Sequence, residues 1–266
     1  MKELTAATPH IHRLVIPFLD IFTTCFIVNT EEGVVLIDTA TYPTDVDDYI
    51  VPALQELGVQ PEQLKYAVIT HNHRDHAGGL ERFAQRFPQT VVVAGSTGCE
   101  ARIPGKTVQV MEDGQTLLGP LKVVALPGHT YDFLGILDTR TKTLISGDGL
   151  QMYGIYGSGN WGANISLIPE HLELGERLKQ MDIETILASH NYHPCDWRAD
   201  GKEAVCRYVD ECANALFALK DYAARYPELD NQDLAAQYNA SSGLPTVGAH
   251  VFKALRAAVA AGQLEN

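Results

Sequence analysis

Three imidazoles and a carboxylate fall within six residues in the segment Thr70-His71-Asn72-His73-Arg74-Asp75-His76-Ala77-Gly78-Gly79. The segment directly follows an apolar run that begins at Leu64. Elsewhere, three further donors each lie at the end of an apolar run of their own: His129, Asp148 and His190. Core packing does not require these polar side chains together, whereas a pair of divalent cations requires nitrogen and oxygen donors of this kind. We therefore predict a metal site.

The composition is that of a globular protein. The chain has 266 residues, 45% of them apolar and 20% charged, which suits one large domain or one domain with an appendage. A net charge of −13 opposes binding to nucleic acid or to anionic lipid. Five cysteines without a CxxC pair indicate a reducing compartment. The N-terminus lacks a signal-peptide pattern and no apolar run is long enough to span a bilayer, so we expect a cytoplasmic protein.

Hydrophobic patterning predicts two β-rich halves interleaved with helices, followed by a helical tail from about residue 200. Strands are expected at 11–16, 25–28, 34–38, 64–70, 90–94, 107–110, 115–118, 121–126, 133–138, 143–146 and 185–188, of which 107–126 suggests a β-meander. Helices are expected at 45–57, 78–87, 169–181, 203–225, 232–238 and 247–261. The glycine-rich stretch 149–162 is expected to form a loop.

The metal donors are expected to converge because they lie where strands end. Residues i and i+2 of a strand exit can turn the same way, so His71 and His73 can share one ion. Asp75 and His76 begin the next helix and can face a neighbouring ion. A set of imidazoles and carboxylates suits Zn, Fe or Mn better than Mg or Ca, which prefer oxygen ligands.

The motifs in this chain closely resemble those of the metallo-β-lactamase superfamily. The motifs are His71-x-His73-x-Asp75-His76, Gly128-His129, Gly147-Asp148 and Ser189-His190, and their order and spacing match over residues 11 to about 195. The resemblance implies an α+β fold, a four-layer αββα sandwich with the metals at one edge, together with a small C-terminal helical extension. We expect the sandwich domain at residues 1–200 and the extension at residues 201–266.

The resemblance also implies which residues bind the metals. Two divalent ions, Zn first and Fe or Mn as alternatives, would be held by His71, His73 and His129 for the first ion, by Asp75, His76 and His190 for the second, and by Asp148 as the bridge. Asp38 matches a buried aspartate that steadies the histidine loop. Such ions favour hydroxide over water near neutral pH. Asp75 would then act as the catalytic residue that orients the nucleophile and carries its proton to the leaving group.

Among the branches of the superfamily, the site resembles glyoxalase II-like thioesterases and acyl-homoserine-lactone lactonases. We therefore expect hydrolysis of a thioester or lactone in a small acylated molecule. A lactonase would carry a tyrosine three residues after the bridging aspartate, where this chain has Gln151. Glyoxalase II holds glutathione carboxylates with clustered basic residues of C-terminal helices. Here Lys253 and Arg256 lie on a C-terminal helix, but that clustering is not evident. Both substrate classes stay open.

Three other functions also stay open. They are a mononuclear iron dioxygenase acting on a glutathione persulfide, a nuclease or phosphodiesterase of the same superfamily, and a metal-binding module without turnover. The tail from Gly201 carries six Lys or Arg against eight Asp or Glu, which disfavours nucleic acid. We expect a small-molecule substrate and no nucleic-acid or membrane partner. We expect the tail to pack across the pocket mouth or to form a homodimer contact.

Six loop side chains are candidates for substrate contact, because loops carry such contacts: Tyr131, Tyr153, Tyr156, Asn160, Trp161 and His193. The four remaining histidines are expected to have no role in the site. His10 and His12 are expected to be exposed on a β-edge. His171 and His250 are expected to lie on the surface or to pack in the tail.

Overall fold

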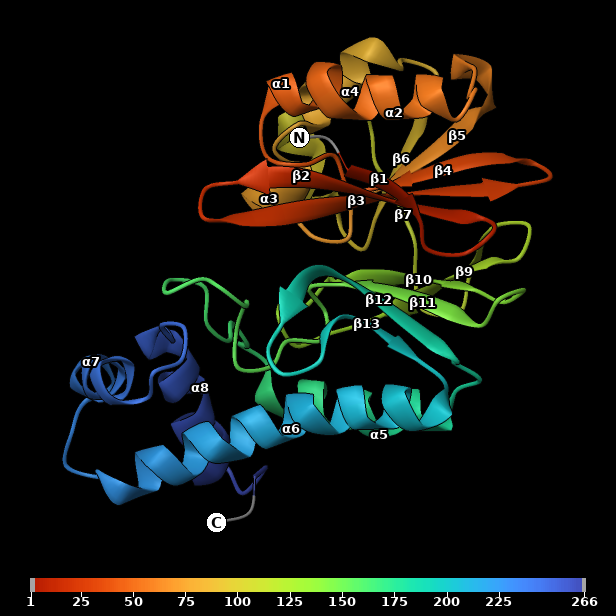
Figure 1. Ribbon diagram of the computed structural model, residues 1–266. Helices are drawn as coiled ribbons and strands as arrows, with labels where there is room; N and C mark the ends of the chain where they lie inside the picture. Colours follow the sequence, from red (N-terminus) through yellow and green to blue (C-terminus); the bar gives the residue numbers. More distant parts are fainter. Residues whose placement is uncertain (1–2, 265–266) are drawn as a thin grey trace. The chain divides into compact units, whose positions relative to one another are not determined.

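The computed structural model describes residues 3–264, and Figure 1 shows its helices and strands. The chain divides into two compact units. The first unit comprises residues 1–125 and 132–141, and the second comprises residues 126–131 and 142–266. This division does not test the boundary expected after residue 200, which stays a prediction.

The first unit contains a seven-stranded sheet with the order β1-β2-β3-β4-β5-β6-β7. Its strands are β1 (Glu3–Ala6), β2 (Ile11–Phe18), β3 (Ile21–Thr30), β4 (Gly33–Ile37), β5 (Leu64–Val68), β6 (Val91–Ala94) and β7 (Gln109–Val110). Strands β1 to β4 are antiparallel neighbours, and β4 to β7 are parallel. Ile37 of β4 is paired with Val68 of β5, so the chain leaves both strands at one edge of the sheet. Asp38 and His71 follow at that edge.

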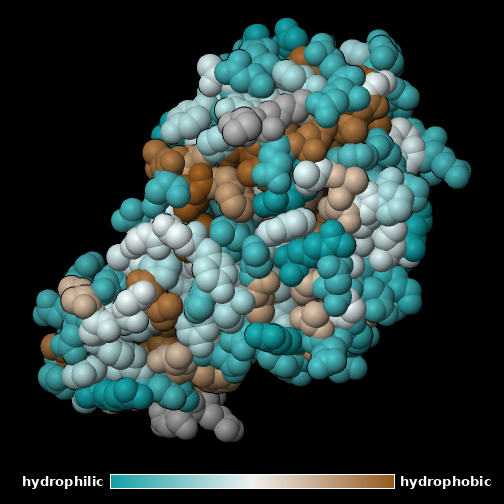
Figure 2. All heavy atoms as spheres, viewed as in Figure 1, coloured by the Kyte–Doolittle hydropathy of each residue, from teal (hydrophilic) through white to brown (hydrophobic). Residues whose placement is uncertain are grey.

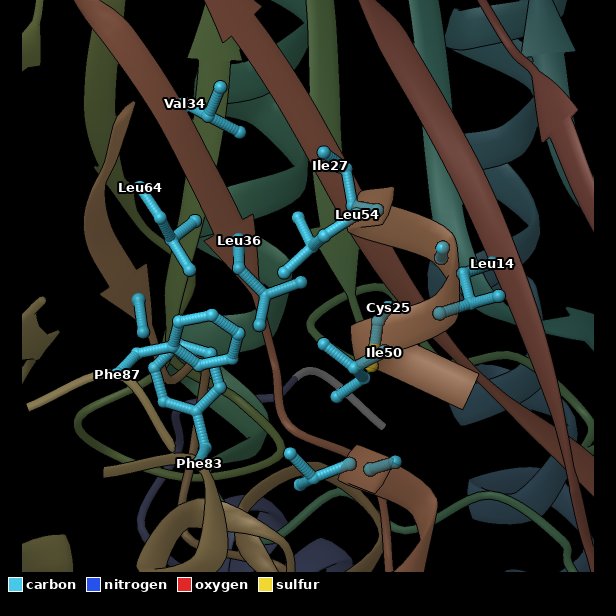
Figure 3. Packing of buried hydrophobic residues seen from close by; sticks show 14 of the residues in the cluster. Leu14, Cys25, Ile27, Val34, Leu36, Ile50, Leu54, Leu64, Phe83 and Phe87 are labelled. Atoms are coloured by element: carbon cyan, nitrogen blue, oxygen red, sulfur yellow. The ribbon is translucent and has the colours of Figure 1, made fainter. Parts of the chain in front are cut away.

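Helices of the first unit pack their apolar side chains against this sheet. The helical segments are α1 (Pro43–Asp45), η1 (Val46–Ile50), α2 (Val51–Glu56), η2 (Pro61–Gln63), α3 (Arg74–Ala77), α4 (Leu80–Arg86) and η3 (Thr97–Arg102). Figure 3 shows Ile50 and Leu54 in the same buried cluster as Leu36 of β4. Burying each such side chain contributes about 1.5–3 kcal/mol. This cluster fixes the helices on the sheet.

The helix expected over residues 45–57 is present but irregular. Its middle turn, Val46–Ile50, is a π-helix between the α-helical segments α1 and α2. Pro52 has no N–H to donate to the carbonyl of Asp48, and the chain widens in the turn before it. The hydrophobic period alone does not reveal this change of helix type.

The other six strands form a sheet with the order β13-β12-β11-β10-β9-β8. They are β8 (Thr116–Leu118), β9 (Leu121–Ala125), β10 (Leu134–Asp138), β11 (Thr143–Gly147), β12 (Thr185–Tyr192) and β13 (Asp196–Asp200). In the parallel pair β11 and β12, Gly147 is opposite Ala188, so Asp148 and His190 lie towards the same edge. The expectation of a meander over 107–126 was wrong in one part, because Gln109–Val110 joins the first sheet parallel to β6.

The helices of the second unit are α5 (Ile168–Gln180), α6 (Lys202–Arg225), α7 (Asn231–Ser241) and α8 (Ala249–Ala260). The three helices expected in the tail are thereby confirmed. Leu216 of α6, Leu234 of α7 and Phe252 of α8 share one buried cluster. Ile165, which follows the glycine-rich stretch, belongs to the same cluster. The tail is thus packed against the segment that leaves the loop.

The face shown in Figure 2 is largely hydrophilic, in keeping with the acidic composition. Large apolar side chains are nevertheless exposed at separate places, among them Leu19, Tyr131 and Phe217. Among the described residues, no helix is both long and apolar enough to cross a membrane.

The expectation for His12 was wrong, and for His171 the surface alternative is excluded. His12 does not lie on a sheet edge, because β2 is paired with β1 on one side and with β3 on the other. His171, a residue of α5, does not lie on the surface, because its exposed fraction is 2%. A Cβ added to Gly128 would approach its Nδ1 to 2.4 Å. Burial, and then the charge of His129, lower the pKa of His171 to about 4.

Replacing Gly78 by alanine should destabilise the fold. Its added Cβ would lie 1.9 Å from the carbonyl oxygen of Thr41, which is far inside van der Waals contact. We expect a loss of about 1–3 kcal/mol in the free energy of unfolding, measured by urea denaturation. Gly159→Ala is the matched control, since its Cβ would meet no described atom within 4 Å. Equal stabilities of the two variants would contradict this account.

The buried His171 should make the protein sensitive to mild acid. Its pKa is lowered from 6.5 to about 4 by folding, so its contribution is complete above pH 6.5 and is lost as the pH falls towards 4. Between pH 7 and pH 5 this amounts to about 2 kcal/mol. In His171→Leu, the drop in unfolding free energy over this interval should be smaller by that amount. A drop equal to that of the wild type would refute the assignment.

Candidate metal centre

The first unit brings four of the predicted ligands into one short segment. His71 follows β5, His73 occupies the N-cap position of α3, and the helix itself carries Asp75 and His76. Ligand atoms of His71 and His73 lie within 4.8 Å of each other. The Nε2 of His76 lies 3.2 Å from Oδ2 of Asp75. Such short separations allow each pair to share one ion.

The buried carboxylate of Asp38 joins the end of β4 to this segment. Its Oδ1 accepts a hydrogen bond from the backbone N–H of Thr70 at 2.8 Å, and both oxygens lie 3.0 Å from the Thr70 hydroxyl. Its Oδ2 accepts from Nδ1 of His76 at 2.7 Å. Asp38 has φ 63°, a left-handed conformation that aspartate tolerates better than most residues. A residue that steadies the histidine loop needs contacts of this kind.

These hydrogen bonds also determine which ring nitrogen of each histidine can bind a metal. Because the Asp38 carboxylate only accepts, Nδ1 of His76 carries the proton and Nε2 presents its lone pair. The Thr70 hydroxyl gives its single proton to Asp38, so at 3.1 Å it accepts from Nδ1 of His71. His71 therefore also presents Nε2. Burial raises the pKa of the Asp38 carboxyl, whereas the imidazole of His76 and the donors of Thr70 lower it.

An arginine that the sequence reasoning missed holds the turn between the first two histidines. The Nε of Arg102, in η3, donates to Oδ1 of Asn72 at 2.7 Å, and its terminal nitrogen donates to the Asn72 carbonyl at 3.0 Å. Asn72 in turn donates to the carbonyl of Gly98 at 3.1 Å. Arg102 lies outside the His-rich segment by more than 20 residues along the chain, so no local pattern could have identified it.

The second unit supplies the other three predicted ligands. His129 follows Gly128, Asp148 follows β11, and His190 lies within β12, which continues past the strand end expected from the sequence. The Nε2 of His190 lies 3.4 Å from Oδ1 of Asp148. The parallel register of β11 and β12 produces this proximity.

His129 is oriented by the backbone of Asn164. Its Nδ1 lies 2.5 Å from the Asn164 carbonyl oxygen, so Nδ1 donates and Nε2 is the nitrogen that would coordinate a metal. The backbone N–H of Asn164 donates to Oε1 of Gln151 at 2.7 Å. The sequence analysis did not select Asn164, since a backbone carbonyl leaves no signature in the sequence.

The described donors fit a borderline divalent cation. Three of the histidines have Nδ1 hydrogen-bonded to protein acceptors, which fixes the tautomer that a metal-binding Nε2 requires. The donor set combines imidazoles with carboxylates, which suits Zn, Fe or Mn rather than Mg or Ca. Among the described residues, two groups of His and Asp side chains could thus hold a metal ion.

Three of the six candidates for substrate contact lie together in the second unit. The ring of His193 lies 4.9 Å from that of Tyr156 and 6.0 Å from that of Tyr153, measured between centroids. Tyr131 is 74% exposed. Asn160 and Trp161 take part in backbone hydrogen bonds of the glycine-rich stretch. A role of these residues in binding substrate stays a prediction.

A family model described as the metallo-beta-lactamase superfamily matches residues 20–190. The protein YobT of Bacillus subtilis (strain 168) is 34% identical over 152 residues, which cover 49% of this chain and 63% of that protein. A hydroxyacylglutathione hydrolase of Synechococcus sp. (strain JA-3-3Ab) is 30% identical over 161 residues, covering 58% of this chain and 60% of that protein. The chain thus matches less than two thirds of the length of either relative.

A similar solved structure is that of a metallo-beta-lactamase family protein from Thermus thermophilus. It has a TM-score of 0.71 at 17% identity, over 95% of this chain and 92% of that chain. This likeness confirms the expected α+β metallo-β-lactamase sandwich with C-terminal helices. Because the family model covers more than half of the sequence, the chain belongs to the metallo-beta-lactamase superfamily.

Proposed function

We propose that this chain is a metal-dependent hydrolase with a dinuclear centre, which cleaves an ester-like bond of a small acylated molecule. The observation that carries the proposal is the set of hydrogen bonds to Nδ1 of His71, His76 and His129. These hydrogen bonds place the proton on Nδ1, so Nε2 is the ring nitrogen that would coordinate a metal. Family membership supports the same chemistry.

We propose that the predicted ligands hold two ions. By the family pattern, His71, His73 and His129 would hold the first ion, Asp75, His76 and His190 the second, and Asp148 would contact both. Zinc is the proposed metal, because imidazole with carboxylate is its usual ligand set. Iron and manganese accept the same donors.

When bound, such ions lower the pKa of water towards 7 and polarise a carbonyl oxygen. The residues of the chain supply orientation and proton transfer. Asp75 is partly exposed and adjoins Nε2 of His76, so it is suited to hold the attacking water and to pass its proton to the leaving group. Asp38 and Thr70 keep His71 and His76 in the required orientation.

A thioester is the proposed substrate in preference to a lactone. The similarity to a hydroxyacylglutathione hydrolase supports a thioester. Gln151, at the position where a lactonase would have tyrosine, already accepts a hydrogen bond from Asn164 and lies beside His129. Arg256 donates to the carbonyls of Tyr226 and Leu229, so its guanidinium stabilises the tail. We also propose that Tyr153, Tyr156 and His193, whose rings lie near one another, contact the substrate.

The proposed partner is a small molecule rather than nucleic acid or membrane, since the net charge is −13. The rival functions give different results on one panel of assays. One iron per chain with oxygen uptake on glutathione persulfide would indicate the dioxygenase. Hydrolysis of bis(p-nitrophenyl) phosphate would indicate a phosphodiesterase. A full metal complement without turnover would indicate a binding module.

Asp148→Ala should lower metal content and abolish thioester hydrolysis together, because the residue is proposed to contact both ions. Elemental analysis of the purified protein and a thioesterase assay measure the two effects. Asp182→Ala, which removes an exposed aspartate, is the control and should retain both properties. Unchanged metal stoichiometry in Asp148→Ala would refute the bridging assignment.

Asp75→Asn should discriminate between leaving groups. A thiolate leaves without a proton far more readily than an alkoxide, because a thiol is a much stronger acid than an alcohol. We expect kcat/KM to fall at least about tenfold more for an oxygen ester than for the thioester of the same acyl group. Metal content is measured in parallel, since Asp75 is also a proposed ligand. Equal losses on both substrates would exclude Asp75 as the proton donor.

A further inference from the structure

A histidine of the C-terminal tail reaches the segment that orients a proposed metal ligand. His250 lies in the first turn of α8, and its Nε2 lies 2.7 Å from Oδ1 of Asn164. An amide oxygen only accepts, so Nε2 of His250 donates in this hydrogen bond. The two residues are 86 positions apart in the chain.

Asn164 joins this contact to His129. Its side chain accepts from His250, its backbone N–H donates to Gln151, and its carbonyl accepts from Nδ1 of His129. With all three groups engaged, the backbone on both sides of Asn164 has little freedom to rotate. The direction of its carbonyl determines the direction of the His129 ring, and hence of Nε2.

The start of α8 is itself fixed to the glycine-rich stretch. The backbone N–H of Thr246 donates to the carbonyl of Gly159 at 3.2 Å, and its carbonyl accepts from Gly162 at 3.0 Å. The Thr246 hydroxyl donates to the carbonyl of Asn160 at 2.9 Å. A Cβ on Gly162 would approach the Thr246 oxygen to 2.4 Å, so the two segments lie in close contact. His250 is therefore held in place by backbone contacts four residues before it.

We propose that His250 is a positioning residue for the metal ligand His129, acting through Asn164, and that the C-terminal tail thereby sets metal affinity. The inference rests on the proposed metal centre. Removing His250 frees the Asn164 side chain, lets its peptide rotate, and leaves the His129 ring less well oriented. The tail then has a function at the proposed site.

The test measures zinc affinity by competition with a chromophoric chelator in the full-length protein. Loss of a partner bonded directly to a ligand costs about 10–100-fold in metal affinity. His250 acts one residue further away, so we expect His250→Ala to weaken binding about three- to tenfold. His250→Gln should restore it, because the amide N–H of glutamine can donate to the same oxygen. Lys253→Ala, an exposed change on the same helix, should have wild-type affinity.

Two further variants separate positioning from general loss of stability. In Gly248→Ala the added Cβ would lie 2.5 Å from Nδ1 of His250, so the ring is displaced without being removed. Asn164→Ala removes the shared acceptor, so adding His250→Ala to it should weaken binding no further than Asn164→Ala alone. The absorption spectrum of the cobalt-substituted protein should change in the same variants. Thermal unfolding of the metal-free protein reports folding independently.

The possible results distinguish this inference from the proposed function. If the wild type binds no zinc, the proposed zinc centre fails and this inference fails with it. If the wild type binds zinc and His250→Ala, Gly248→Ala and Asn164→Ala bind it equally tightly, the inference alone fails. Weaker binding in all three variants, with rescue by His250→Gln, supports it.

Discussion

The hydrogen bonds of the Asp38 carboxylate hold together the end of β4, the end of β5 and the start of α3. A carboxylate with 1% exposure must be compensated, because burying an unpaired charge costs several kcal/mol. Thr70 and His76 provide that compensation. His76 thus compensates the buried charge of Asp38, and Asp38 in turn fixes the orientation of the His76 ring. The parallel pairing of β4 and β5 brings these groups to one edge.

In the second unit a predicted metal ligand is also oriented by a hydrogen bond, but its acceptor is a backbone carbonyl. Parallel pairing of β11 and β12 again brings two donors to one edge, here Asp148 and His190. His129, however, donates to the neutral carbonyl of Asn164 rather than to a carboxylate. A charged acceptor makes an imidazole more basic than a neutral one does, so His76 should be the stronger donor to a metal than His129. His250 of the tail donates a hydrogen bond to the side chain of the same Asn164.

The parts predicted correctly from sequence are those encoded locally. The apolar strands, the tail helices and the close spacing of His71, His73 and His76 follow from periodicity and motif. The edge strands β1 and β13 were missed because each has only four or five residues, mixed polar and apolar, which give a weak hydrophobic signal. Long-range contacts explain the other misses. The burial of His171 depends on the approach of Gly128, and the role of Arg102 depends on a loop 30 residues away.

The apolar cluster of the tail also contains residues that precede the tail in the sequence. Leu216, Leu234 and Phe252 share their cluster with Ile165 and Ile168, which precede and begin α5. Removing the residues after 200 would expose these two isoleucines and release the hydrogen bond from His250 to Asn164. The segment that orients His129 would lose apolar packing worth about 1.5–3 kcal/mol for each isoleucine. Burial of these isoleucines and orientation of a proposed ligand therefore both depend on the tail.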